Sequence, residues 1–100
     1  MEFGISSKDA EILNSVFKKF PQVKQVILYG SRAKGNFREN SDVDLVIANS
    51  EIDRYSIGKI LSEIDDSNFP YLVDIQVLNT IKNKELLDDI DRVGKILFSF

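Results

Sequence analysis

The stretch from residue 29 to residue 47 reads YGSRAKGNFRENSDVDLVI and places a Gly-Ser pair ten residues before two aspartates, Asp42 and Asp44. The apolar run after Asp44 is typical of a buried strand. Side chains two apart in a strand point to the same face and lie about 6.6 Å apart. We therefore expect Asp42 and Asp44 to share one face, while Val43, Leu45 and Ile47 point into a core. Two like charges at the start of a buried strand need an explanation.

Alternating elements surround this stretch. Apolar spacing predicts helices and β-rich runs predict strands, and the short strand before the Gly-Ser pair is apolar on both faces. We expect helices from a cap at Ser6 or Ser7 to Pro21, over 52–64 and over 84–92, and strands over 25–29, 42–48, 71–78 and from 96 to the end. A short helical turn is expected over 31–34, and Gly94 is a candidate helix C-cap.

A third aspartate lies in the strand expected over residues 71–78. Val73, Ile75 and Val77 form one apolar face of that strand, and Asp74 lies on the other. If this strand neighbours the one that carries Asp42 and Asp44, three carboxylates converge and raise one another's pKa unless a cation is present. Mg²⁺ prefers such hard oxygen ligands. Two ions about 3.5–4 Å apart stabilise both the attacking and the leaving oxygen of a phosphoryl-type displacement.

The Gly-Ser pair predicts a complementary phosphate site. Gly30 ends a strand, and the N–H groups of the helical turn that follows are free to bind an anion. Glycine permits close approach of the backbone, and the Ser31 hydroxyl adds a donor. Arg32, Lys34 and Arg38 supply positive charge, and the sequence leaves open which of them contacts phosphate.

The composition limits the class of function. A chain of 100 residues with 43% hydrophobic and 29% charged residues predicts one compact domain over 1–100. With no Cys and no His, any metal must be bound by oxygen. The net charge of −3 and the lack of a basic block argue against an extended nucleic-acid surface. No run of about 18 apolar residues is present, so we expect no membrane segment and a cytoplasmic location.

Each motif also has a purely structural explanation. A D-x-D triplet arises easily in a chain with 16 acidic residues, Gly-Ser is often only a turn, and Asp74 alone fits a water-facing strand. Two other motifs lack residues that they require. The G-x-x-x-x-G spacing of a P-loop is followed by Asn36 and Phe37 instead of Lys and Ser/Thr, and Leu45 occupies the glycine position of an EF-hand loop that begins at Asn40.

The order of the motifs resembles the signature of the minimal nucleotidyltransferases of the DNA polymerase β superfamily, which is Gly-Ser, ten residues, then Asp-x-Asp. Gly30 and Ser31 match the Gly-Ser pair, Asp42 and Asp44 match the two metal-binding aspartates, and Asp74 in YLVDIQVL matches the third carboxylate. The ending DRVGKILF also looks like that of the family. The resemblance implies an α+β, α/β-like fold with a mixed β-sheet and helices packed mainly on one face.

The resemblance also implies the roles of the site residues. Asp42, Asp44 and Asp74 would be catalytic and hold two Mg²⁺ ions, with Asp74 helping to take the proton from the attacking hydroxyl. Gly30, Ser31 and Arg32 would bind the substrate ATP.

The family further implies transfer of AMP from Mg-ATP to a hydroxyl, with pyrophosphate leaving. The expected acceptor is a helical HEPN-type partner protein, so that the chain acts as the antitoxin of a toxin-antitoxin pair; a homodimer is another expected assembly. The alternative hypothesis is a catalytically silent nucleotide-binding module that neutralises its partner by binding. A purely structural domain would leave Asp74 unexplained.

Overall fold

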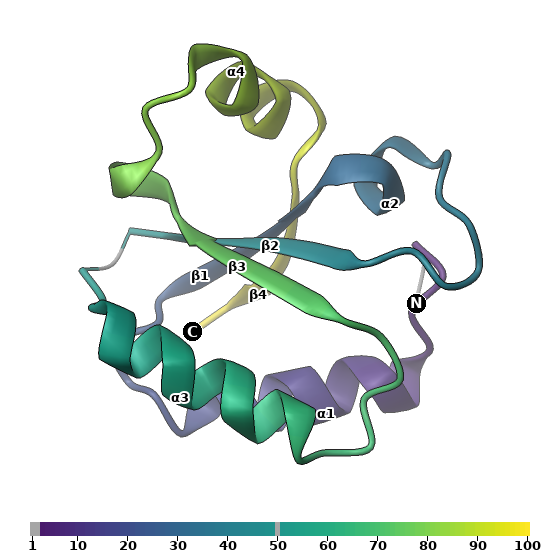
Figure 1. The fold of residues 1–100 in the computed structure, drawn as a ribbon, viewed down its shortest axis with the longest axis vertical. Coiled ribbons are helices and arrows are strands. Elements are labelled where there is room, and N and C mark those ends of the chain that lie inside the picture. The colour runs from purple at the N-terminus through teal and green to yellow at the C-terminus, as the bar shows by residue number, and fades with distance from the viewer. Residues whose placement is uncertain (1–2, 50) are drawn as a thin grey trace.

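Four strands form one mixed sheet in the computed structural model, which describes residues 3–49 and 51–100. The strands are β1 (Gln25–Tyr29), β2 (Val43–Ala48), β3 (Val73–Val77) and β4 (Lys95–Ser99), in the order β3-β2-β1-β4. β1 is antiparallel to both β2 and β4, and β2 is parallel to β3 (Figure 1). The predicted strands that carry Asp44 and Asp74 are therefore neighbours.

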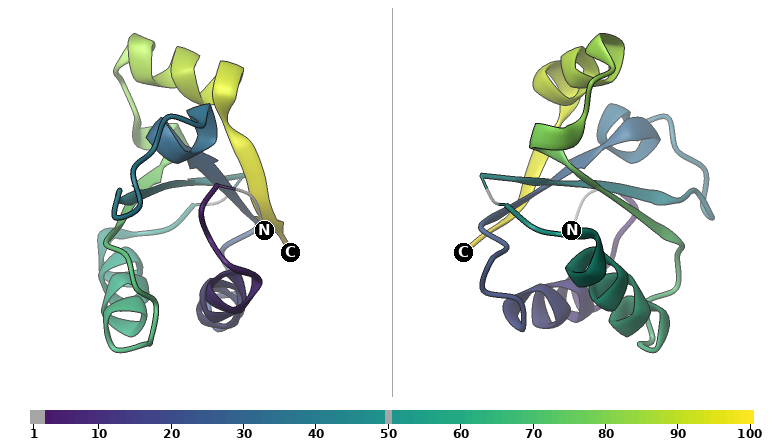
Figure 2. Two further views of the ribbon diagram at one scale, coloured as in Figure 1. Left: turned by 90° about the vertical axis from the view of Figure 1, so that its right-hand side faces the viewer. Right: turned by 60° about the vertical axis from the view of Figure 1, so that its left-hand side comes forward.

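The two longest helices, α1 (Ser7–Lys18) and α3 (Arg54–Asp65), lie side by side on one face of the sheet (Figures 1 and 2). Each begins at a side-chain cap: the Ser6 hydroxyl accepts from the Asp9 N–H at 3.1 Å, and the Asp53 carboxylate accepts from the Ser56 N–H at 2.8 Å. Such caps satisfy N–H groups that have no partner within the helix. The short helix α2 (Gly30–Lys34) and α4 (Lys84–Val93) lie on the other side of the sheet.

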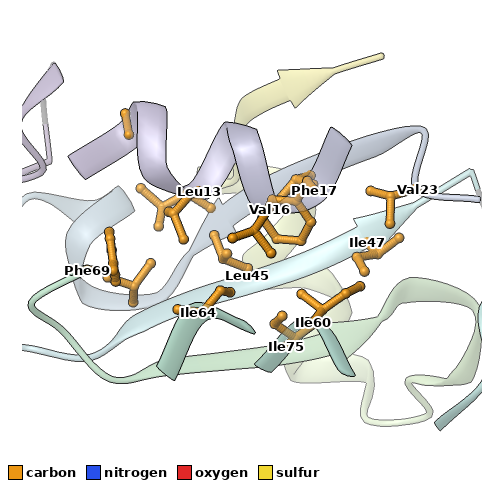
Figure 3. Close-up of a cluster of buried hydrophobic side chains, with 14 of the residues drawn as sticks. Leu13, Val16, Phe17, Val23, Leu45, Ile47, Ile60, Ile64, Phe69 and Ile75 are labelled. Carbon is orange, nitrogen blue, oxygen red and sulfur yellow. The ribbon is translucent and has the colours of Figure 1, made fainter. Parts of the chain in front are cut away.

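The main core lies between the sheet and the pair α1 and α3 (Figure 3). Val43, Leu45 and Ile47 of β2 are fully buried in it, which confirms the predicted alternation of β2. Phe17 of α1 and Ile60 of α3 are fully buried from the helix side. Since burying a side chain of this size contributes about 1.5–3 kcal/mol, this face fixes the register of β2, and with it the side on which Asp44 lies.

A smaller apolar cluster lies on the opposite face, beneath α4. Its buried members are Tyr29, Val46 and Ile90, with Ile27, Leu78, Ile81 and Leu86 packed against them. This cluster covers one part of the sheet and leaves Asp44 only half-buried and Asp74 exposed. The opposite face of the sheet is therefore apolar under α4 and acidic beside it.

The structure corrects one local prediction. The third strand is shorter than residues 71–78, because the chain turns into a 3₁₀ helix, η1 (Leu78–Thr80), directly after Val77. Gly94 is confirmed as the C-cap of α4: its N–H donates to the Ile90 carbonyl at 2.9 Å, and its φ is −59°. It is needed for space, because a Cβ there would lie 2.3 Å from the Ile90 carbonyl oxygen. The terminal strand is confirmed as β4. Among the helices of residues 3–49 and 51–100, none has the length and apolar character required to cross a membrane.

Candidate active site

The parallel pairing of β2 with β3 places Asp44 directly beside Asp74, as Cα partners in register. Both side chains lie on the face opposite the main core. Asp42 is exposed and immediately precedes β2. The pKa of Asp44 is raised by burial first, and then by the negative charges of Asp74 and Asp42. Asp44 therefore lies within electrostatic reach of both other predicted carboxylates.

This acidic patch has no cationic partner from the described part of the chain. None of the ion pairs formed by residues 3–49 and 51–100 includes Asp42, Asp44 or Asp74. In the same residues, no three carboxylates are grouped so that they could hold a metal ion as they stand. The patch thus offers the charge and the hard oxygen donors that Mg²⁺ prefers. Its three carboxylates are not close enough together to coordinate one ion.

Tyr29 belongs to the same patch, although the sequence reasoning did not single it out. It is the register partner of Asp44 on β1 and is buried. Burial raises the pKa of Tyr29 to about 12, with further contributions from the charges of Asp74 and Asp44 and from its hydrogen bond with the Asp74 side chain. A hydroxyl at the end of an otherwise apolar strand is the signal that could have identified it. Tyr29 links Asp74 to the centre of the sheet.

Gly30 brings the Gly-Ser pair into contact with the acidic patch. Its φ is +75°, and a Cβ at this position would lie 2.3 Å from Asp44 Oδ2. Only glycine meets both demands without strain, because other residues rarely adopt this backbone conformation. Ser31 follows in the first turn of α2. The predicted phosphate site and the predicted metal-binding aspartate are therefore adjacent.

Arg32, one of the residues predicted to bind the nucleotide, is buried and has partners within the chain. Its side chain is only 1% exposed. Nε and Nη2 donate to the Ser41 carbonyl at 3.2 and 2.8 Å, and Nη1 donates to the Phe3 carbonyl at 2.8 Å. The guanidinium also lies over the Tyr71 ring, 4.3 Å from its centroid, and 5.0 Å from that of Phe37. Its donors are thus occupied in holding the loop that leads to Asp42.

The other two predicted cations have different surroundings. The Arg38 side chain is exposed, and its backbone N–H donates to the Ser41 hydroxyl at 2.8 Å. Lys34 forms an ion pair with Asp89 of α4, at 3.3 Å between Nζ and Oδ2. Of the three cations, Arg32 is therefore fixed in the interior and the other two reach the surface.

A comparison with known protein families decides the relationship. The family model described as polymerase beta, nucleotidyltransferase matches residues 11–100 of this chain. The chain belongs to this family. The resemblance inferred from Gly-Ser and Asp-x-Asp is thereby confirmed.

Individual relatives of this nucleotidyltransferase agree with the family assignment. A curated relative, protein adenylyltransferase MntA of Aphanizomenon flos-aquae (strain 2012/KM1/D3), is 33% identical over 88% of this chain. The chain spans 65% of the length of that relative.

Solved structures share the fold. A chain from the crystal structure of a toxin-antitoxin with AMP-PNP superposes with a TM-score of 0.72 at 18% identity, covering 91% of this chain and 73% of that one. A chain from the complex of a tri-AMPylated Shewanella oneidensis HEPN toxin with an MNT antitoxin gives 0.66 at 15% identity, covering 93% and 71%. The predicted α+β fold with a mixed sheet is confirmed, with α1 and α3 on one face and α4 on the other.

The negative charge of Asp44 is expected to lower the free energy of unfolding of this nucleotidyltransferase. Because its pKa is raised, the folded protein binds this proton more tightly than the unfolded chain, so its contribution to the free energy of unfolding falls as the pH rises through the raised pKa. We expect Asp44→Asn to melt at a higher temperature than the native protein at about pH 7, and this advantage to vanish towards about pH 3. Because solvent screens the charge of a half-exposed side chain, the gain in melting temperature should be about 1–5 °C.

Thermal unfolding with a chelator present measures this difference, since bound cations would mask the repulsion. The variant Glu51→Gln, in the loop between β2 and α3, removes the charge of an exposed side chain outside the helices and strands; it is the control and should show no such gain. A difference in melting temperature that does not grow between acid and neutral pH would contradict the repulsion.

Proposed function

We propose that this nucleotidyltransferase transfers AMP from Mg-ATP to a hydroxyl of a helical HEPN-type partner protein, as the antitoxin of a toxin-antitoxin pair. The observation that carries the proposal is the contact of Gly30 with Asp44, whose register partner is Asp74. The relative at 33% identity is named a protein adenylyltransferase. Structures of the same fold include one with AMP-PNP and one with an AMPylated HEPN toxin. These names support AMP as the transferred group and a protein as the acceptor.

Asp42, Asp44 and Asp74 are the residues proposed to hold Mg²⁺. Their oxygen donors and their unneutralised charge fit this ion, and closing the ligand set requires the three carboxylates to move closer together. When bound, Mg²⁺ neutralises phosphate charge and stabilises the leaving oxygen. The number of ions, expected to be two, is part of this proposal.

Residues of the chain itself are proposed to bind the phosphates and to accept the proton of the acceptor hydroxyl. Gly30, without a Cβ, lets a phosphate approach the backbone, and the Ser31 hydroxyl is placed to donate to it. Asp74 is exposed at the edge of the sheet, where an acceptor hydroxyl can reach it and give up its proton. Tyr29 and Gln76 hold this carboxylate in place, the latter through a hydrogen bond from Nε2 at 3.4 Å.

The surface beside Asp42 suits an acceptor that belongs to a protein. A hollow there is lined by Glu39, Asn40, Asp42, Pro70, Tyr71 and Leu72. Leu72 is 72% exposed there, so an apolar side chain is available at the rim of this hollow for a protein acceptor to cover. A protein acceptor would cover this residue while its hydroxyl reaches the aspartates.

Transfer of label tests the proposal directly. The native chain, incubated with the cognate partner, Mg²⁺ and ATP labelled at the α-phosphate, should leave label covalently on the partner. ATP labelled at the γ-phosphate should leave none, because that phosphate departs with pyrophosphate. Absence of α-label from the partner under conditions where the two proteins form a complex would refute the activity.

A second function is favoured by one observation. Because no three carboxylates of residues 3–49 and 51–100 are grouped around a metal site, the chain can instead be a nucleotide-binding module that neutralises its partner by covering it. Asp42→Asn separates the two functions. An enzyme would lose neutralisation with this variant while still binding the partner, whereas a covering module would neutralise as well as the native chain.

Gly30→Ala provides a further prediction for the enzyme. The left-handed backbone should cost about 1–2 kcal/mol of stability, and the new Cβ must displace the Asp44 carboxylate. Misplacement of a catalytic group by about 1 Å lowers rates by about 10²-fold, and we expect a loss of this size in AMP transfer.

Gly35→Ala is a matched control for this change. Gly35 also has a positive φ, +84°, but a Cβ there meets no atom within 4 Å. Both variants should lose similar stability in urea unfolding, and only Gly30→Ala should lose transfer. Equal loss of transfer in the two variants would mean that backbone strain, not contact with Asp44, is responsible.

A further inference from the structure

We propose that Tyr29 is a positioning residue for AMP transfer, and that its hydroxyl sets the orientation in which the Asp74 carboxylate accepts the proton of the acceptor hydroxyl. This inference rests on the proposed function, because it assumes that Asp74 takes part in the transfer. It goes further by making the activity of an exposed carboxylate at the edge of the sheet depend on one buried side chain from another strand.

Tyr29, Asp44 and Asp74 form one row across three neighbouring strands. Tyr29 of β1 is the register partner of Asp44 of β2, and Asp44 is the register partner of Asp74 of β3 (Figure 1). Register partners point to the same face of a sheet. Because neighbouring strands are about 4.8 Å apart, a side chain from β1 must extend across β2 to reach Asp74. The Tyr29 side chain does so, since its hydroxyl is hydrogen-bonded to the Asp74 carboxylate.

The ring of Tyr29 is held in place by the apolar cluster beneath α4. Tyr29 is 8% exposed, and the other buried members of this cluster are Val46 of β2 and Ile90 of α4. Close packing leaves a buried side chain few alternative rotamers. A buried tyrosine hydroxyl usually has a hydrogen-bond partner, and here the partner is Asp74. The cluster therefore presents the hydroxyl at one fixed place beside the carboxylate.

Asp74 has few other contacts that restrict its side chain. It is exposed and belongs to a strand with a neighbour on one side only. It takes part in none of the ion pairs formed within residues 3–49 and 51–100. The hydrogen bond from Gln76 Nε2 to Asp74 Oδ2 is long, at 3.4 Å. Hydrogen bonds to an ionised carboxylate are the stronger kind, so the buried Tyr29 hydroxyl is the main restraint on Asp74.

The hydrogen bond from Tyr29 leaves Asp74 able to react. An ionised carboxylate has two oxygens and accepts several hydrogen bonds. In the transfer, the acceptor oxygen forms a bond to the α-phosphorus, the bond from that phosphorus to pyrophosphate breaks, and the acceptor proton passes to Asp74. Tyr29 keeps its own proton throughout. Without the hydroxyl, Asp74 would be chemically intact but less well oriented, whereas the phosphate contacts of Gly30 and Ser31 would not change.

Steady-state rates of AMP transfer to the cognate partner test this role with Tyr29→Phe, which keeps the ring and removes only the hydroxyl. We expect kcat to fall by about 10–100-fold, as for loss of a group that orients a carboxylate of a metal site. The KM for ATP should stay within about twofold of the native value. Tyr55→Phe removes a hydroxyl from an exposed tyrosine of α3, on the other face of the sheet, and is the matched control.

A double variant with Asp74→Ala shows whether Tyr29 acts through Asp74. Ala is used because the amide oxygen of Asn would still accept the hydrogen bond. Thermal unfolding with a chelator and no nucleotide measures the contact itself. Tyr29→Phe should lower the melting temperature of the native chain by about 4–8 °C and should change neither the melting temperature nor the kcat of Asp74→Ala. Independent roles predict that the two effects add.

The outcomes distinguish this inference from the proposed function. If the native chain transfers AMP and Tyr29→Phe keeps its kcat, the role of Tyr29 is refuted and the proposed function is untouched. If Tyr29→Phe lowers the melting temperature or the kcat of Asp74→Ala as much as that of the native chain, Tyr29 acts elsewhere and the inference is refuted. If the native chain transfers no AMP to a partner that it binds, the proposed function fails, and this inference fails with it.

Discussion

Replacing Asp44 with Asn is expected to lower AMP transfer to the partner by about 10³-fold or more, the scale on which loss of charge stabilisation at a reacting centre is felt. The substitution keeps the size of the side chain and removes the charge that faces Asp74 and Gly30. Asp74→Asn should cost about 10²–10⁴-fold, since it removes the group proposed to take a proton from the acceptor.

Two measurements make this prediction decisive. Initial rates of α-phosphate label transfer give the loss, and thermal unfolding shows whether the variant is folded. Asp44→Asn should be folded and slightly more stable than the native protein at neutral pH, because its charge is repelled by Asp74 and Asp42. Loss of activity together with a gain in stability cannot result from unfolding. Transfer within tenfold of the native rate would refute the role of Asp44, and Glu51→Gln, at an exposed residue of the loop between β2 and α3, is the control.

Replacing Arg32 with Ala is expected to lower the free energy of unfolding by about 3–5 kcal/mol. The substitution empties a buried volume and leaves the carbonyl groups of Phe3 and Ser41 without their donor. It also removes the contact with the two aromatic rings, which contributes further when the cation is desolvated. For a domain of this size the loss is a large fraction of the total stability.

Urea unfolding of Arg32→Ala measures this cost, and Arg38→Ala is the control. Arg38 is exposed in the loop that follows α2, and its truncation should change stability by no more than about 0.5 kcal/mol. Arg32→Lys keeps the charge but not the planar set of donors, so an intermediate loss is expected. If Arg32→Ala unfolded like the native chain but no longer bound the nucleotide, Arg32 would be a phosphate ligand after all.

Much of the fold follows from patterns that are local in the sequence. The strand over 25–29 and the caps of α1 and α3 were predictable because they depend on neighbouring residues. The side on which Asp44 lies also follows from its neighbours Val43 and Leu45, which must be buried. The sequence predicted Asp74 beside Asp44 only if their two strands were neighbours. Which strands pair depends on the whole sheet and not on adjacent residues.

Other features of the site depend on contacts between distant segments and could not be predicted. Arginine is rarely buried. No feature of the sequence around Arg32 predicts that Phe3 and Tyr71, which are distant in the sequence, contact it. The role of Tyr29 depends in the same way on Asp74, which is far along the chain. The ion pair of Lys34 with Asp89 likewise joins α2 to a helix near the end of the sequence. The spacing of residues along the chain therefore predicted the aspartates of the site, but not the contacts that distant residues make around them.

The place of β3 at the margin of the sheet carries one more consequence. Asp74 belongs to a strand that has a neighbour on one side only, whereas Asp44 belongs to a central strand. Edge strands detach from a sheet more easily than central strands, because fewer backbone hydrogen bonds must break. Local detachment of this strand would separate the two carboxylates proposed to hold Mg²⁺, so we expect the proposed AMP transfer to be lost before the whole domain unfolds.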